Sequence, residues 1–133
     1  MDLTTTTTRW APRMLSILRI VSALIFMAHG TQKILGFPAS SMNPPLMSLS
    51  GVAGLIELVG GALLLIGLFS RPVAFILSGE MAFAYFIAHA PKSVFPALNG
   101  GDAAILYCFV FLYIAFAGPG PWSIDAQRGH GRI

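Results

Sequence analysis

The stretch Met14–Leu35, MLSILRIVSALIFMAHGTQKIL, is long and apolar enough to cross a bilayer as a helix, yet it contains ionisable residues. At about 100° per residue, Arg19, His29 and Lys33 lie within roughly 80° of one another around this helix. An arginine in hydrocarbon costs about 2.5–3.5 kcal/mol on insertion scales. We therefore expect this side of the helix to face other protein or a water-filled cavity, and the remaining helices to supply polar partners.

The composition places the chain among membrane proteins. Of its 133 residues, 56% are hydrophobic and 10% are charged, whereas soluble domains carry about 25% charged residues. The formal net charge is only +3, and the basic residues gather at the ends of the apolar segments, which indicates membrane topology and excludes a nucleic-acid surface. The single cysteine, Cys108, permits neither an internal disulfide nor a redox-active pair, so any electron transfer would need a borrowed cofactor.

Hydropathy and helix-breaking residues predict an all-α polytopic membrane protein, a bundle of four transmembrane helices. The transmembrane domain is expected over residues 14–122, between a disordered N-terminal tail at 1–13 and a C-terminal tail at 123–133. The five consecutive threonines of the N-terminal tail lack the apolar content to pack. The four predicted spans cover about 14–35, 45–69, 72–90 and 102–117.

Turn and cap signals separate these spans. Asn43-Pro44-Pro45 is typical of a helix start, because prolines in a first turn lose no hydrogen bond. Ser70-Arg71-Pro72 indicates a tight break before the third span. Asn99-Gly100-Gly101 predicts a turn ahead of Asp102, whose carboxylate could cap the fourth helix.

Small residues indicate where helices approach one another closely. Gly54 and Gly61 flank Glu57 on its own face of the second span and would let a neighbouring helix or a ligand come near. In the third span, the row that begins with Ala74 and Ser78 repeats a small residue at every fourth position. Both patterns predict close packing inside the membrane.

The distribution of basic residues predicts the topology. With four spans, both termini lie on the same side of the membrane. That side would carry Arg9, Arg13, Arg71, Arg128 and Arg132, against Lys33 and Lys92 on the opposite side. Because basic residues concentrate on the cytoplasmic side, both termini are predicted to be cytoplasmic.

The depth of each ionisable group follows from a rise of about 1.5 Å per residue and suggests two layers. Arg19 and Glu80 fall at matching depth near the cytoplasmic edge and form a predicted inner pair. The predicted outer cluster consists of His29, Lys33, Glu57, His89, Asn99 and Asp102. Glu80 and His89 point to opposite faces of an ideal helix, so one cavity would hold both only if the third helix bends.

Each ionisable group also has a purely structural interpretation. Arg19 could form a buried ion pair with Glu80 or Glu57 that does no more than fix the packing of the helices. Asp102 could serve only as a helix cap. These interpretations remain open beside a direct role in chemistry or transport.

Two cofactor arrangements are disfavoured on chemical grounds. His29 and His89 lie at similar heights on different helices, as a bis-histidine haem would require, but histidines near helix ends need no ligand. A metal site would need His29, Glu57, His89 and Asp102 to converge, and no motif brings them together. We therefore predict no metal site and do not expect haem.

Several short motifs follow one another over about Arg19 to Asp125. They are Arg19 ahead of His29-Gly30-x-x-Lys33, Glu57-x-x-Gly60-Gly61 with Gly67-Leu68 and Arg71, MAFAYFIAHAP at Met81–Pro91, Phe95-Pro96, Asn99-Gly100-Gly101-Asp102, and GPGPWSID at Gly118–Asp125. In order and spacing they resemble the DoxX family of small bacterial four-helix membrane proteins, which also takes in the DoxD-like subunit of thiosulfate:quinone oxidoreductase. The sequence departs from the family at Asp102, where relatives usually carry Glu.

The resemblance implies a multi-pass protein of the bacterial cytoplasmic (inner) membrane, linked to quinone-dependent sulfur or thiol redox chemistry. We expect a subunit of a quinone-linked oxidoreductase that lies in the lipid bilayer, uses quinone and needs a redox partner subunit. The candidates for lining a polar pocket or moving protons are Arg19, His29, Lys33 and Glu57, followed by Glu80, His89 and Asp102. Two alternatives stay open: a transporter or permeability factor for protons or a small solute, and a structural partner of another membrane enzyme. A homo-oligomer is compatible with each.

Overall fold

The computed structural model describes residues 2–39 and 47–129, and over these residues it contains helices and no strand, which confirms the predicted all-α class. Three helical stretches in the described part are long and apolar enough to cross a membrane, and a fourth apolar helix is shorter. In chain order the elements are α1 (Leu3–Leu35), α2 (Leu49–Ile66), α3 (Ser70–Ala84), the π-helix η1 (Tyr85–His89), the 3-10 helix η2 (Ala90–Lys92), α4 (Pro96–Asn99), α5 (Asp102–Ala117) and α6 (Ile124–Gln127).

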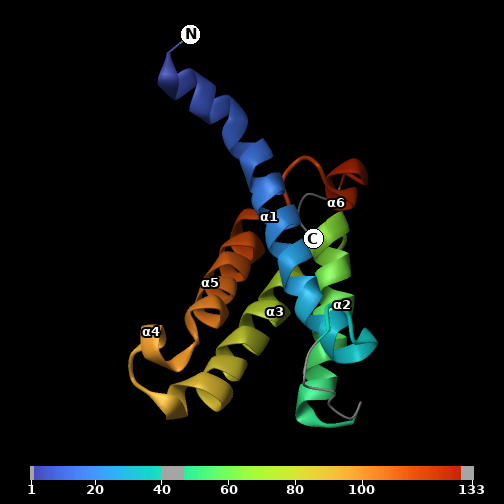
Figure 1. Ribbon diagram of the computed structural model, residues 1–133. Helices are drawn as coiled ribbons and strands as arrows, with labels where there is room; N and C mark the ends of the chain where they lie inside the picture. Colours follow the sequence, from blue (N-terminus) through green and yellow to red (C-terminus); the bar gives the residue numbers. More distant parts are fainter. Residues whose placement is uncertain (1, 40–46, 130–133) are drawn as a thin grey trace.

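The helices α1, α2, α3 and α5 form the bundle, and α1 crosses the other helices along its length (Figure 1). α1 packs mainly against α2, α3 packs mainly against α5, and the two pairs meet through α2–α3 and α1–α5 contacts. At the centre, the buried rings of Phe26 and Phe111 meet edge to face with 4.9 Å between their centroids. The two pairs diverge toward the end that carries α4.

The start of α1 and the short helix α6 lie at the same end of the bundle (Figure 1). This agrees with the antiparallel order that four spans require. The assignment of that end to the cytoplasm stays a prediction, supported by the arginines that it carries.

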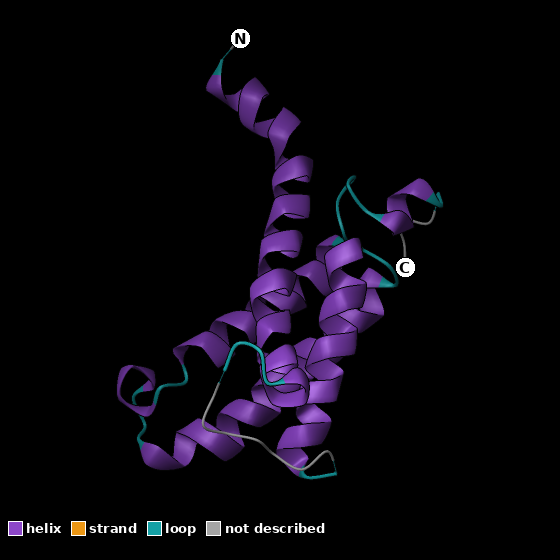
Figure 2. Cartoon of the chain, turned by 45° about the vertical axis from the view of Figure 1, so that its right-hand side comes forward, coloured by secondary structure: helices purple, strands orange, loops and turns teal. Residues whose placement is uncertain are grey.

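The N-terminal turns of α1 project beyond the other helices (Figure 2). Residues 3–13, for which the sequence predicts a disordered tail, are helical in the structure. The Asp2 carboxylate caps this helix by accepting a hydrogen bond from Thr5 N at 2.8 Å. The hydroxyl of Thr6 donates to the backbone oxygen of Asp2 at 3.1 Å. The carboxylate cap supports the start of the helix without any packing partner, and hydropathy does not report it.

Some predicted boundaries agree with the structure, whereas the predicted break at Ser70-Arg71-Pro72 is wrong, because α3 already begins at Ser70. α1 ends at Leu35 and α5 covers Asp102–Ala117, both as predicted. α2 stops at Ile66, short of the predicted boundary, because Gly67 takes a left-handed conformation with φ of 73° and closes the helix. The predicted helix start at Asn43-Pro44-Pro45 lies outside the described residues.

The C-terminal segment is part of the fold at least as far as α6, although the sequence predicts a tail from residue 123. The Ser123 hydroxyl caps α6 by accepting a hydrogen bond from Ala126 N at 3.1 Å. The buried carboxylate of Asp125 accepts hydrogen bonds from Phe69 N at 3.0 Å and from Ser70 N at 2.9 Å. Asp125 therefore caps the start of α3 from a distant part of the chain.

Glycines allow the close approach of α1 and α2 that the sequence predicts. A Cβ atom on Gly30 would lie 2.5 Å from Leu58 N and 2.8 Å from the backbone oxygen of Gly54. A Cβ atom on Gly54 would lie 2.7 Å from the Cβ of Lys33. The lysine side chain consequently lies directly against α2.

Replacing Gly30 by alanine is expected to lower the free energy of unfolding by about 1–3 kcal/mol, because the added methyl group meets backbone atoms that cannot move aside. Gly79 on α3 is the matched control, since a Cβ atom there meets nothing within 4 Å. Gly79→Ala should be neutral or raise stability by about 0.5–1 kcal/mol through helix propensity. Unfolding in detergent micelles measures both, and a loss of equal size at both glycines would contradict the prediction.

The third predicted span is irregular at its C-terminal end. The α-helix stops at Ala84, Tyr85–His89 form a π-helix, and Ala90–Lys92 form a 3-10 turn. A π turn contains more residues than an α turn, so it rotates the following side chains around the helix axis. The position of His89 relative to Glu80 therefore differs from that on an ideal helix.

Candidate functional site

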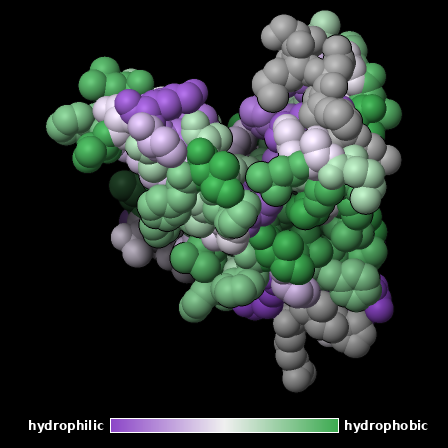
Figure 3. All heavy atoms as spheres, turned by 90° about the horizontal axis from the view of Figure 1, so that it is seen from below, coloured by the Kyte–Doolittle hydropathy of each residue, from purple (hydrophilic) through white to green (hydrophobic). Residues whose placement is uncertain are grey.

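A cavity of about 280 Å³, the central cavity, lies between the helix pairs where they diverge. His29, Lys33, Glu57 and His89 form its polar wall, so these members of the predicted outer cluster come together. The rest of its wall includes Phe26, Met81, Ala104 and Tyr107. Viewed from the end that carries α4, hydrophilic residues are visible in a recess between hydrophobic ones (Figure 3).

Lys33 and Glu57 form an ion pair between α1 and α2. The lysine Nζ lies 3.1 Å and 3.2 Å from the two carboxylate oxygens of Glu57, whose side chain is almost fully buried. A buried carboxylate requires a compensating cation and hydrogen bonds. Arg19 was a predicted partner of Glu57, and in the structure Lys33 is the partner instead.

Glu80 on α3 lies next to this ion pair. Both of its carboxylate oxygens are buried, and neither accepts a hydrogen bond from any donor within residues 2–39 and 47–129. The Glu80 carboxyl instead lies within hydrogen-bonding reach of the Glu57 carboxyl, and the charge of Lys33 acts on it as well. Two acids thus lie beside one lysine, which donates its hydrogen bonds to Glu57.

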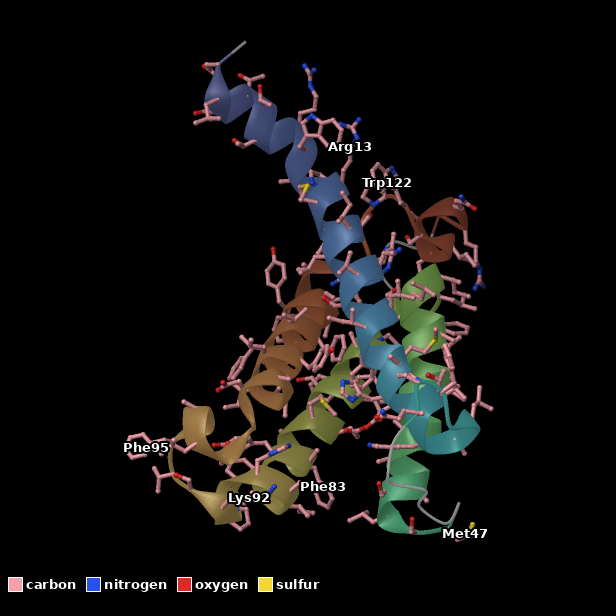
Figure 4. The ribbon with its side chains drawn as sticks, in the orientation of Figure 1. Arg13, Met47, Phe83, Lys92, Phe95 and Trp122 are labelled. Atoms are coloured by element: carbon pink, nitrogen blue, oxygen red, sulfur yellow. The ribbon has the colours of Figure 1, made fainter. Side chains whose placement is uncertain are left out.

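A second cavity of about 360 Å³, the flanking cavity, adjoins the central one, and Lys33, Ala84 and Ala88 line both. Glu80 lines the flanking cavity but not the central one. Its wall is otherwise mostly apolar and includes Leu49, Ala53, Phe83 and Ile87. Phe83 projects from α3 on the side of the N-terminal half of α2 (Figure 4). Glu80 and His89 therefore face different cavities.

His89 is held in place by the loop before α5. Its Nδ1 lies 3.1 Å from the backbone oxygen of Asn99, and because a carbonyl oxygen only accepts, Nδ1 carries the hydrogen and donates. Asn99 is buried and donates to the Tyr85 hydroxyl at 3.1 Å and to the Ser93 backbone oxygen at 3.0 Å. This network fixes the imidazole at the cavity wall.

Arg19 is not among the residues that line either cavity. Its fully buried guanidinium donates to the backbone oxygens of Pro119 and, at 2.7 Å, Trp122, which lies beside α1 in Figure 4. The negative charge of Asp125 stabilises the positive charge of this guanidinium. The predicted pair of Arg19 with Glu80 is wrong, because the C-terminal segment folds back over α1 and provides the acceptors.

Asp102 lies outside the central cavity, at the exposed first residue of α5. The residue that caps this helix is Gly101, and no side-chain capping bond is formed, so the predicted capping role of Asp102 is wrong. In the described part of the chain, no three His, Cys, Asp or Glu residues are placed to hold a metal ion.

Tyr107 lines the central cavity although it was not among the predicted site residues. Its ring centroid lies 5.2 Å from that of Phe26 and 6.1 Å from that of His29, with the rings edge to face in both pairs. The available signal was the small pair Ala103 and Ala104 one turn earlier, which leaves space on the same face of α5. Ser16 and Asp125 were missed as well, because their partners are backbone groups.

The comparisons with known proteins agree with this architecture. The family model for DoxX matches residues 14–90. A Haemophilus influenzae protein described as uncharacterized is 45% identical over 126 residues, which cover 88% of this chain and 92% of the relative. The inner membrane protein YphA of Escherichia coli is 28% identical over 127 residues, which cover 87% of this chain and 91% of YphA.

No solved structure matches the chain, so the assignment depends on sequence relatives and on the helices themselves. The DoxX match covers more than half of the chain, and the apolar helices have the length that a bilayer requires. The chain therefore belongs to the DoxX family and is a multi-pass protein of the bacterial inner membrane.

Proposed function

We propose that this chain is a subunit of a quinone-linked membrane oxidoreductase and that its central cavity receives the quinone head group. The supporting observation is that a lysine, a buried acid, two histidines and a tyrosine line one cavity among apolar helices. Ionisable groups in such surroundings are costly and usually mark a functional site. The quinone-dependent chemistry that the resemblance to the DoxX family implies favours a quinone over other ligands.

The size and chemistry of the cavity suit a single ring with two carbonyl groups. Its volume of about 280 Å³ lies just below the roughly 300–1,000 Å³ typical of ligand pockets. Lys33, His29 and the Tyr107 hydroxyl can each donate a hydrogen bond to a carbonyl oxygen, and Phe26 offers an apolar ring surface. The apolar wall of the flanking cavity could hold the first part of an isoprenoid tail.

The proposed reaction requires a partner for its electrons. Reduction of a quinone to a quinol consumes two electrons and two protons. The single cysteine cannot supply two electrons by forming an internal disulfide. In this proposal the electrons come from a thiol or sulfur compound that another subunit binds and that is oxidised there. The role proposed for this chain is to bind the quinone and to provide protons through Lys33 and the acids beside it.

Tyr107→Phe is expected to weaken the binding of a short-tailed ubiquinone analogue about two- to tenfold, because it removes one neutral hydrogen-bond donor. Tyr113→Phe is the matched control, because Tyr113 lies on the exposed side of the same helix. The Tyr113→Phe variant should bind the analogue as the wild type does. Isothermal titration of the full chain in detergent measures both. Absence of binding by the wild-type chain, or equal weakening in both variants, would contradict the proposal.

A second candidate function is the movement of protons or a small solute across the membrane. This function is favoured by the position of Lys33, which lines both the central and the flanking cavity. Together with Glu57 and Glu80 it forms an ionisable cluster between the two cavities, and such clusters inside a membrane mark ion and solute pathways. Uptake by reconstituted vesicles that disappears in Glu57→Gln, together with an absence of quinone binding, would favour this function over the first.

A further inference from the structure

We propose that Glu57 and Glu80 share a single proton, so that the cluster with Lys33 stores one transferable proton on the wall between the two cavities. The proposal concerns the charge state of the protein itself. It goes beyond the proposed function and does not depend on which ligand the central cavity binds.

The hydrogen bonds of the cluster carry this inference. Both oxygens of Glu57 accept from Lys33 Nζ, at 3.1 Å and 3.2 Å. The buried oxygens of Glu80 have no donor among the residues that the structure describes, and the group they approach is the Glu57 carboxyl. Two ionised carboxylates have no hydrogen between them and repel each other. A proton on one of them converts the contact into a hydrogen bond.

The charge balance supports the same state. With Lys33 protonated and both acids ionised, the buried cluster would carry one net negative charge, and one bound proton makes it neutral. Other charged groups nearby do not change this balance. Arg19 donates hydrogen bonds to the backbone oxygens of Pro119 and Trp122 in a different part of the bundle. His29 and His89 line the central cavity together with Glu57, but the His89 ring hydrogen-bonds to the backbone oxygen of Asn99 and the His29 ring packs edge to face against Tyr107.

The position of the pair gives the shared proton a possible route. Glu57 lines the central cavity and Glu80 lines the flanking cavity. When the proton moves from an oxygen of Glu80 to an oxygen of Glu57, one O–H bond breaks and one forms, and no electrons are transferred. A proton taken up on one side of the wall thus becomes available on the other.

Infrared spectroscopy of the full chain in lipid nanodiscs, without added quinone and at neutral pH, tests the proposal. The C=O stretching band of a protonated carboxylic acid, identified by its shift in D₂O, should correspond to one acid per chain. The chain has only five Asp and Glu residues, so substitution can assign the band. Asp102→Asn is the control for the loss of an exposed acid, and it should leave the band unchanged.

Glu80→Gln should abolish the band while the protein still folds, because the amide can donate the same hydrogen bond to Glu57. Glu57→Gln should also abolish the band, because it leaves Glu80 alone with Lys33 and therefore ionised. Each variant serves as a check if the other fails to fold. A wild-type chain without the band, or a band that survives either replacement, would overturn the proposal even if quinone binding were demonstrated.

Discussion

Asp125→Ala is expected to lower the free energy of unfolding by about 3–6 kcal/mol, because two backbone N–H groups lose a charged acceptor worth about 1.5–3 kcal/mol each. These groups belong to Phe69 and Ser70, where α3 begins. Ser70 and Asp125 are buried, so water cannot readily replace the lost acceptor. The same change removes the acid that acts on the charge of Arg19.

Equilibrium unfolding in mixed micelles measures the loss, and Asp102→Ala is the matched control. Asp102 has the same side chain and also lies at the start of an apolar helix, but it is exposed and makes no capping bond. Its replacement should change stability by less than about 1 kcal/mol. Asp125→Asn should fall between the two, because its single side-chain oxygen can still accept from one N–H group. Equal losses at the two aspartates would show that Asp125 does not hold the C-terminal segment to α3.

The spans could be predicted from the sequence because a single physical term dominates them. The bilayer requires about 20 apolar residues per helix, and glycine, proline and asparagine interrupt these runs at few places. The α5 boundaries agree with prediction because Gly101 and Gly118 stand directly beside the ends of the apolar run. At the N-terminus, the Asp2 carboxylate caps α1, and the helix extends there without any apolar signal.

The partners of the buried charges could be predicted only in part. Depth and helical face were sufficient to bring His29, Lys33, Glu57 and His89 to one cavity. Depth alone also pairs Arg19 with Glu80, because it treats the helices as parallel and considers only side chains as partners.

In the structure, the backbone carbonyl groups of Pro119 and Trp122 accept hydrogen bonds from Arg19, and every residue type has such a carbonyl group, so the sequence does not identify them as partners. The helix pairs also diverge toward one end, which changes the neighbours of Glu80 (Figure 1).

Lys33→Met is expected to lower the free energy of unfolding by about 3–5 kcal/mol, because it leaves the buried Glu57 without its cation. The Glu57 side chain is only 3% exposed, so water can do little to replace the lysine. Lys92→Met is the matched control. Lys92 is exposed at the end of η2, and its replacement should have little effect.

The double variant Lys33→Met with Glu57→Leu separates a structural role from a functional one. Replacement of a buried ion pair by apolar residues of similar size is often neutral or stabilising, so most of the lost stability should return. The folded double variant should nevertheless fail to bind the short-tailed quinone, because the polar wall of the central cavity is reduced to its histidines and Tyr107. If the double variant is stable and binds the quinone as the wild type does, the ion pair only sets the register of α1 against α2. If the two losses of stability simply add, Lys33 and Glu57 do not act as a pair at all.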